Sequence, residues 1–136
     1  MHSKRKGNIG QFAIGLELTR LGYSVFTEEG DISKIDIIAE KGGQLIRIQS
    51  KAITPVNNKL ILNLKKSGPN YKFQYECGMF DYFGIYDLED GNVYLVPDSV
   101  LSENTNAFIL RKTPAKNNQV SGIHMASDYL IKKMLT

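Results

Sequence analysis

Residues 33–51 read SKIDIIAEKGGQLIRIQSK and predict a β-hairpin. The apolar run at residues 35–39 is typical of a strand, and Gly42-Gly43 is a turn signal. Polar and apolar residues then alternate over residues 45–51, which is the period of a strand with one face toward a core. The other face of this second strand is unusually polar, and a function can be inferred from it.

Three polar residues of the hairpin form a candidate catalytic site. Gln49 and Lys51 are two positions apart, so they point from the same face of their strand, and Asp36 on the neighbouring strand can reach the same cleft. A phosphodiester nuclease needs oxygen ligands for a hard divalent cation and a positive charge near the attacked phosphate. These residues can meet that need, although a solvated sheet face with Lys51 at its edge would show the same pattern.

The rest of the chain predicts two helices and several more strands. Apolar residues recur at helical spacing over residues 9–21, with Asn8 as the N-cap, Gln11 in the capping-box position and Gly22 at the end. Further strands are expected at residues 23–27, 79–86, 93–96 and 108–110, a protruding ribbon at 59–66, and a C-terminal helix at 125–135. This order predicts a single α/β domain over residues 1–136, with a mixed central β-sheet flanked by helices.

Charge is sorted along the chain in blocks. Seventeen Lys and Arg residues against fourteen Asp and Glu residues give a formal charge of +3. Residues 41–75 carry seven basic and no acidic residues, 76–110 carry seven acidic and no basic ones, and 111–136 carry five basic and one acidic. Basic edges on either side of an acidic body are expected to face an anionic partner, and nucleic acid is the first candidate.

Composition excludes several classes of protein. An apolar share of 42% in 136 residues is enough to build a core, so a disordered chain is not expected. The single cysteine, Cys77, cannot form an internal disulfide or a thiolate metal cage, which favours a reducing compartment. No run approaches the roughly 18 apolar residues of a membrane span, and no apolar core of a signal peptide follows the charged N-terminus. A soluble cytoplasmic protein is expected.

Three segments together resemble the PD-(D/E)XK nuclease superfamily. They are the Gly7-x-x-Gly10-Gln11 start of the first helix, Asp36 in the hairpin, and FILRKTPAKNNQVSGIHMASDYL at residues 108–130. Within the superfamily, the sequence is similar to the small group I intron-encoded homing endonucleases of bacteria and, more distantly, to archaeal Holliday-junction resolvases. The resemblance implies a restriction-endonuclease-like core.

The resemblance also implies a role for each candidate residue. Asp36 matches the aspartate that binds the metal, expected to be Mg²⁺ or another divalent cation such as Mn²⁺ or Ca²⁺, and Lys51 matches the catalytic lysine. Gln49 stands where the superfamily usually has Asp or Glu and would be a neutral metal ligand, while Ile35 replaces the proline of the motif. Gln11 stands where a glutamate is expected, so Asp36 is the one assigned carboxylate and metal affinity should be weak.

Gln11 therefore leaves two interpretations of the site open. It can mark a low-activity or inactivated nuclease, for instance an engineered form that stays trapped on its substrate, or it can serve only to cap the first helix. Glu17 lies about 240° around a helix from Gln11 and does not replace the missing acid. Three acids on the loop before Asp36 can reach inward, although no pattern fixes them there: Glu28, Glu29 and Asp31.

Candidate DNA contacts lie in the basic segments. Phosphate contacts are expected from Lys and Arg, and base contacts from amide side chains that can read adenine edges. The candidates are Arg5, Lys6, Lys59, Lys65, Lys66, Arg111, Lys116, Asn117, Asn118 and Gln119, with Lys112 as a further cation beside them. A solvated turn at residues 117–119 and a charged protective edge at 65–66 would account for the same residues. His2 is expected to be disordered, and His124 to be structural or DNA-facing.

These observations favour a sequence-specific, Mg²⁺-dependent endonuclease that cuts double-stranded DNA, of the homing endonuclease type. A chain this short that must recognise a long site is expected to form a homo-oligomer, either a dimer or a tetramer. Two other hypotheses stay open. The neutral residues Gln11 and Gln49 are compatible with a DNA-binding protein that keeps the nuclease fold without chemistry, and the shared fold is compatible with a Holliday-junction resolvase.

Overall fold

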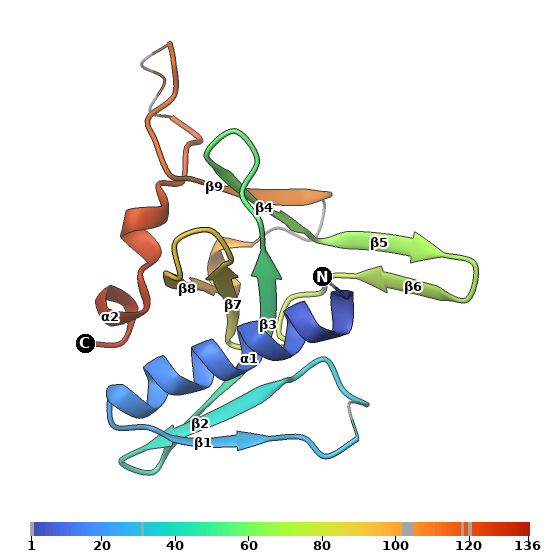
Figure 1. Cartoon of the computed structure of the whole chain (residues 1–136), viewed down its shortest axis with the longest axis vertical. Coiled ribbons are helices and arrows are strands. Elements are labelled where there is room, and N and C mark those ends of the chain that lie inside the picture. Colours follow the sequence, from blue (N-terminus) through green and yellow to red (C-terminus); the bar gives the residue numbers. More distant parts are fainter. Residues whose placement is uncertain (1, 31, 102–104, 118, 120) are drawn as a thin grey trace.

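A five-stranded mixed sheet forms the centre of the computed structural model, which describes residues 2–30, 32–101, 105–117, 119 and 121–136. Its strands lie in the order β1 (Ser24–Thr27), β2 (Ile37–Lys41), β3 (Gln44–Ile53), β7 (Tyr82–Asp87) and β8 (Val93–Pro97), as Figure 1 shows. β3 and β7 run parallel, and the other neighbouring pairs are antiparallel. The predicted α/β class with a mixed central sheet is confirmed.

The predicted hairpin is β2 and β3. Lys41 pairs with Gln44 around Gly42 and Gly43, whose φ angles of 60° and 85° belong to the left-handed region that glycine adopts without strain. Ile48 of β3 is fully buried on one face of the sheet, as the alternation predicted. The polar residues of β3 therefore lie on the opposite face from Ile48.

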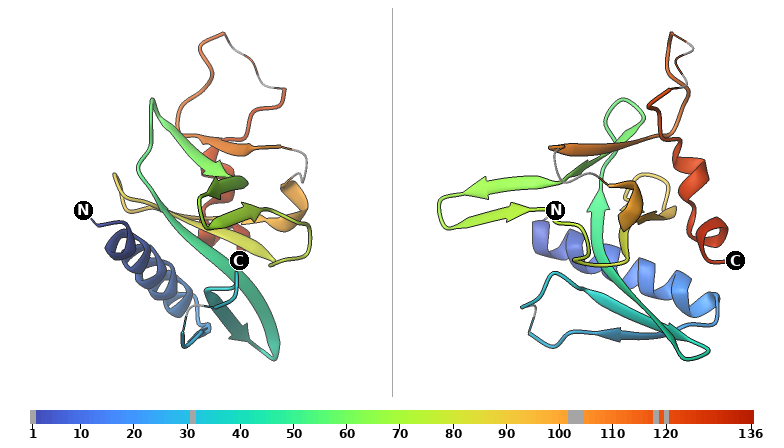
Figure 2. Two further views of the ribbon diagram at one scale, coloured as in Figure 1. Left: turned by 90° about the vertical axis from the view of Figure 1, so that its right-hand side faces the viewer. Right: turned by 180° about the vertical axis from the view of Figure 1, so that it is seen from behind.

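Helix α1 (Ser3–Arg20) covers one face of the sheet, and Figure 2 shows it lying across the strands. Ile14 and Leu18 of α1 are fully buried and belong to the same core as Ile48. A Cβ added to Gly10 would lie 3.0 Å from Ala52 Cβ on β3, so only glycine permits this close approach. The helix start is thereby held directly against the strand that carries Lys51.

A second, two-stranded sheet covers the other face. It consists of β4 (Lys59–Asn63) and β9 (Ala107–Arg111), which pair antiparallel. Leu60, Leu62 and Leu110 are buried in one core with Phe83 and Ile85 of the central sheet. The alternating leucines of β4 therefore form an apolar strand face that covers this face of the central sheet, as α1 covers the opposite face.

A ribbon of β5 (Lys65–Gly68) and β6 (Tyr71–Gln74) projects from the body (Figure 1). The prediction of one ribbon over residues 59–66 is wrong, because Leu64 is fully buried and separates β4 from β5. Lys59 consequently belongs to the covering sheet, while Lys65 and Lys66 belong to the ribbon.

The helix termini differ from the sequence predictions. α1 begins at Ser3, and the His2 ring, predicted to be disordered, is its N-cap and accepts a hydrogen bond from the Lys4 N–H at 3.2 Å. Asn8 and Gln11 are thus inside the helix and cap nothing, because the first turns are polar and carry no apolar period that would reveal them.

The C-terminal segment is also divided into shorter pieces than predicted. A single helix at 125–135 is replaced by η2 (Ala126–Tyr129) and α2 (Ile131–Met134), while η1 (Asp98–Val100) follows β8. Leu130, between η2 and α2, has an extended backbone and forms a bridge to Tyr94 of β8. None of the helices in the described part of the chain combines the length and the apolar character needed to cross a bilayer.

Candidate active site

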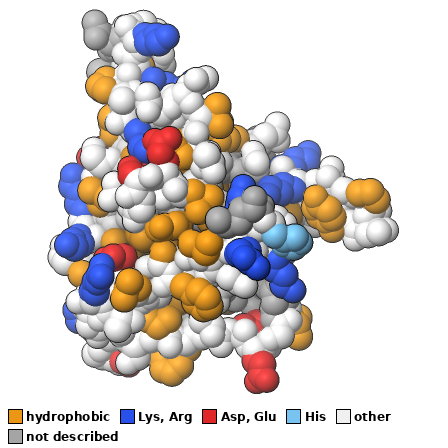
Figure 3. Space-filling view, viewed as in Figure 1, with side chains coloured by type: hydrophobic (Ala, Val, Ile, Leu, Met, Phe, Trp, Pro, Cys, Tyr) orange, Lys and Arg blue, Asp and Glu red, His pale blue; other side chains and the backbone are white. Residues whose placement is uncertain are grey.

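A cleft of about 690 Å³ opens where the first turns of α1 meet β3 and the loop between β1 and β2. Three of the four predicted catalytic residues line it: Gln11, Asp36 and Lys51. Lys4, Lys6, Glu28 and Ser50 line it as well. Figure 3 shows Lys and Arg side chains gathered between the start of α1 and the ribbon, so this end of the molecule presents positive charge to an anionic partner.

Asp36 is built into the end of the sheet. Its N–H donates to the carbonyl of Ile48 at 2.9 Å, and its Oδ2 accepts hydrogen bonds from the N–H of Ser50 at 2.8 Å and from Ser50 Oγ at 3.2 Å. The side chain thus takes the place of a backbone acceptor where β2 begins. Asp36 is therefore fixed in position beside β3, as a metal-binding carboxylate should be.

Lys51 is half-buried and lies near a second lysine. Burial is the largest cause that lowers the pKa of Lys51, to about 8, followed by the side chain of Lys66, while Asp36 opposes the shift. Lys66 comes from the ribbon and was predicted only as a DNA contact. Two cations next to one another favour an anion between them, and a DNA phosphate has the required charge.

Gln49 is the one predicted catalytic residue that does not line the cleft. It follows Ile48, to which the Asp36 N–H is bonded, and its Oε1 is buried without a hydrogen-bond partner in the described structure. A buried oxygen of this kind requires a donor or a cation. The oxygens of Asp36 and Gln49 fit a hard divalent cation in chemical type, although the described residues contain no cluster of three His, Cys, Asp or Glu side chains that would hold a metal.

Glu28, one of the three loop acids expected to be able to reach inward, lines the cleft. Its Oε1 accepts the N–H of Ile32 and, at 2.9 Å, the N–H of Ser33. Hydrogen bonds from the Ser33 side chain, then from the backbone of Ser33 and Ile32, lower the pKa of Glu28. The carboxylate is therefore ionised and held by its own loop. No sequence pattern distinguished Glu28 from Glu29 or Asp31.

The basic residues predicted to contact DNA, apart from Lys116 in the segment after β9, are spread over three places. Arg5 and Lys6 lie in the first turns of α1, where Lys6 lines the cleft. Lys59 pairs across strands with Arg111 at the far end of the covering sheet. Lys65 and Lys66 lie on the ribbon, with Lys65 exposed and Lys66 turned toward Lys51.

The last residue of β9, Arg111, and the next residue, Lys112, are two cations that already have partners. The guanidinium of Arg111 donates to the carbonyls of Thr113 at 3.1 Å and Pro114 at 3.3 Å. Lys112 Nζ forms ion pairs with Asp87, Glu89 and Asp90 at 2.9, 3.1 and 3.2 Å. The expectation that Lys112 holds a phosphate is therefore wrong, because three carboxylates at the turn between β7 and β8 already neutralise its charge.

The amide-rich part of this segment is exposed. Lys116, Asn117 and Gln119 are exposed, and Asn117 Oδ1 accepts the N–H of Gln119 at 3.2 Å. Asn118 lies outside the described residues. These side chains are open to solvent. The ring of His124, in contrast, packs on Phe108 with centroids 4.5 Å apart, and its Nδ1 lies 3.3 Å from the hydroxyl of Tyr129. His124 has the structural role that was one of its two predicted alternatives.

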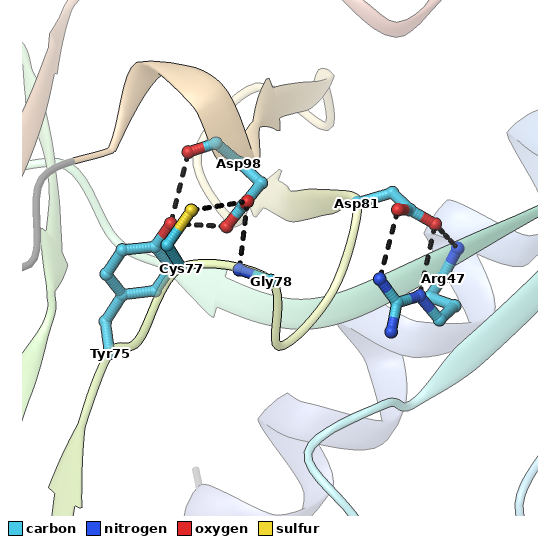
Figure 4. A network of polar contacts seen from close by, with 6 residues as sticks. All are labelled: Arg47, Tyr75, Cys77, Gly78, Asp81 and Asp98. Carbon is cyan, nitrogen blue, oxygen red and sulfur yellow. Dashed lines mark hydrogen bonds and ion pairs between the residues drawn. The ribbon is translucent and has the colours of Figure 1, made fainter.

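A network of polar contacts holds the base of the ribbon, and Figure 4 shows it. The Asp98 carboxylate accepts hydrogen bonds from the Tyr75 hydroxyl, from Cys77 Sγ at 3.4 Å and from the Gly78 N–H at 3.1 Å. Tyr75 follows β6 directly and is fully buried. The ribbon therefore leaves the body from a fixed point.

A second contact in the same view joins β3 to the segment before β7. Asp81 accepts the Arg47 N–H at 2.8 Å and pairs with its guanidinium at 3.3 Å. Partial burial opposes ionisation of Asp81, but the bonds from Arg47 hold its pKa below the usual range. This pair fixes β3 on the side opposite β2.

The fold, the hairpin and the cleft together define a class of protein. The sequence model of the PD-(D/E)XK endonuclease family matches residues 1–132, and the chain belongs to this family. The predicted family is thereby confirmed.

Two solved structures share the fold. The bacterial homing endonuclease I-Ssp6803I is similar with a TM-score of 0.77 and 19% identity, over 99% of this chain and 93% of that one. The Holliday-junction resolvase Hjc of the archaeal hyperthermophile Archaeoglobus fulgidus is similar with a TM-score of 0.51 and 15% identity, over 79% of this chain and 84% of that one. A comparison with curated proteins found no match.

Proposed function

We propose that the protein is a sequence-specific, divalent-metal-dependent endonuclease that hydrolyses phosphodiester bonds in double-stranded DNA, of the homing endonuclease type. One observation carries the proposal: Asp36, Lys51 and Gln11 line a single cleft together with Lys4 and Lys6. A carboxylate for a metal and cations for a phosphate thus lie within one opening. Such a role would place the protein in the cytoplasm, with the DNA.

Each residue of the cleft has a defined task in this proposal. Asp36 and Gln49 would hold Mg²⁺, or Mn²⁺ or Ca²⁺ in its place, and the ion would stabilise the developing charge on the phosphate and activate water. Lys51 donates hydrogen bonds to the phosphate and neutralises it in the transition state. Lys4 and Lys6 hold neighbouring phosphates at the entrance.

DNA recognition is assigned to the elements that project from the body. A two-stranded ribbon fits the major groove, and Lys65 on β5 is exposed to meet it. Lys116, Asn117 and Gln119 form a second reading segment at the opposite end of the covering sheet. The family match and the fold of I-Ssp6803I support DNA as the substrate.

Self-association would double the DNA length that the protein can read. Phe12 and Leu16 lie one helical turn apart on the outer face of α1 and are 74% and 51% exposed. We propose this face as the contact with a second copy in a dimer or tetramer. Sedimentation of a Phe12→Ser, Leu16→Ser variant should give the monomer, and an unchanged mass would contradict the assignment.

The catalytic proposal is tested by cleavage of double-stranded DNA by two variants. Gln11→Glu adds a carboxylate to the cleft and should increase the Mg²⁺-dependent rate, while Lys51→Ala should abolish cleavage and leave DNA binding nearly unchanged. An inert Gln11→Glu protein, or normal cutting by Lys51→Ala, would refute the assignment.

Two alternatives have specific discriminators. The neutral side chains of Gln11 and Gln49 favour a non-catalytic DNA-binding protein, which should bind duplex with a steep salt dependence but show no heat of Mg²⁺ binding in calorimetry. A Holliday-junction resolvase would prefer a four-way junction over linear duplex in competition. Indifference to the branch would reject that function.

A further inference from the structure

Glu28 lies next to Asp36 at the open end of the sheet. Thr27 and Ile37 form the last pair between β1 and β2, and the next residues beyond this pair are Glu28, which follows Thr27, and Asp36, which precedes Ile37. Adjacent strands lie about 5 Å apart, which brings the two backbones within reach of one ion. Both residues line the main cleft, and both also line the smaller hollow beside it.

The Glu28 carboxylate is held in place by its own loop. Its Oε1 accepts the N–H groups of Ile32 and Ser33, so the loop folds back onto the side chain. A carboxylate has about four lone-pair sites, and the two N–H donors with the Ser33 side chain use up to three of them, so capacity for a cation is left. The loop thus orients the group before any ligand binds.

Charge in the cleft explains why a second carboxylate matters. Gln11 and Gln49 are neutral, and a site with Asp36 alone supplies one negative charge to an ion that carries two. Sites for such ions in proteins normally combine carboxylates with neutral oxygens. Gln49 does not line the cleft, but it and Asp36 are the next residues beyond the Ile37–Ile48 pair, and its buried, unpartnered Oε1 is a neutral oxygen of the kind such a set includes.

Other acids near the cleft are not candidates for the second carboxylate of the cation site. Glu17 pairs with Arg20 on α1 at 2.8 Å. Glu29 is exposed and does not line the cleft, and Asp31 lies outside the described residues. Glu28 is therefore the acid that the structure itself places beside Asp36.

We propose that Glu28 supplies the second carboxylate of a divalent-cation site that it forms with Asp36 and the amide oxygen of Gln49. The inference rests on the proposed function, because it concerns the ion of the same cleft. In this site Glu28 would supply the carboxylate that the neutral residue Gln11 on α1 lacks.

The test is a titration of the full chain with Mn²⁺ in the absence of DNA, in which electron paramagnetic resonance measures the free ion. The salt concentration is about 0.3 M, so that long-range charge effects are screened. Glu28→Gln keeps an oxygen acceptor for Ile32 and Ser33 but removes the charge. We expect it to weaken Mn²⁺ binding at least tenfold. Glu29→Gln, the matched control one residue away, should change the affinity less than twofold. Gln11→Glu in the Glu28→Gln background should restore most of the affinity.

Three results would overturn the inference. They are wild-type affinity in Glu28→Gln, equal losses in Glu28→Gln and Glu29→Gln, and no Mn²⁺ binding by the wild-type chain. Thermal unfolding of both variants shows whether the fold is intact. If Mn²⁺ binds through Glu28 but no DNA is cut, the site stands and the proposed nuclease activity fails. If DNA is cut and Glu28→Gln binds Mn²⁺ normally, the activity stands and the inference fails.

Discussion

Replacing Lys112 with methionine should destabilise the protein strongly. The Lys112 ammonium lies 2.9 Å from Asp87 Oδ2, and its side chain is 15% exposed while that of Asp87 is fully buried. Methionine keeps most of the side-chain volume but leaves the Asp87 carboxylate in the interior without a counter-charge. Breaking a buried pair in this way costs about 3–5 kcal/mol. Because domains of this size unfold with about 5–15 kcal/mol, roughly a fifth of the stability or more is at risk.

Urea unfolding at pH 7 measures this loss. Lys133→Met is the matched control, because Lys133 pairs with Asp128 at 3.3 Å but the two side chains are 61% and 64% exposed. Exposed pairs are worth about 0–1 kcal/mol, so the control should shift the free energy of unfolding by less than about 1 kcal/mol. Adding Asp87→Asn to Lys112→Met removes the stranded charge and should recover part of the loss. Equal effects of Lys112→Met and Lys133→Met would refute the reasoning.

Two further predictions concern the cleft. The pKa of Lys51 is lowered to about 8, whereas an ordinary lysine has a pKa of about 10.4. Between these two pH values the unfolded chain binds more protons than the folded one, so the free energy of unfolding should rise with pH. Urea titrations across this window should show the rise in the wild-type protein and not in Lys51→Met. Gly10→Ala should lower the melting temperature, because its Cβ would lie 3.0 Å from that of Ala52 and cause a strain of about 1–3 kcal/mol. A Cβ at Gly7 meets nothing within 4 Å, so Gly7→Ala should stabilise the helix by about 0.5–1 kcal/mol. Equal melting temperatures of the two variants would contradict this.

Features set by neighbouring residues could be predicted from the sequence. The β2–β3 hairpin follows from alternation plus two glycines at the turn, and both signals lie within 20 residues of each other. The same alternation separates Ile48 from Gln49 and Lys51. Asp36 and Lys51 therefore reach one cleft as predicted, because the hairpin alone brings them together.

Features set by distant contacts could not be predicted. The pairing of β4 with β9 joins residues about fifty positions apart, and nothing local to Leu60 or Leu110 specifies the partner. The break at Leu130 depends on its bridge to Tyr94 of β8, so the apolar period alone suggested one helix. Glu28 reaches the cleft through hydrogen bonds within its loop, which leave no periodic signal.

The ribbon of β5 and β6 has a reach that follows from its length. Its four cross-strand pairs, from Lys65 with Gln74 to Gly68 with Tyr71, extend about 10 Å at the usual rise per residue. The major groove of DNA is about 8.5 Å deep, so the tip can pass the phosphates and touch base edges. Tyr75 and Asp98 fix the root, Phe73 of β6 packs against the core, and Lys66 of β5 lies near Lys51, so only the outward residues of the ribbon can be exchanged without disturbing the core or the cleft. If the proposed nuclease activity holds, these outward residues are where directed evolution would retune target preference, while Lys66 and the cleft would be kept.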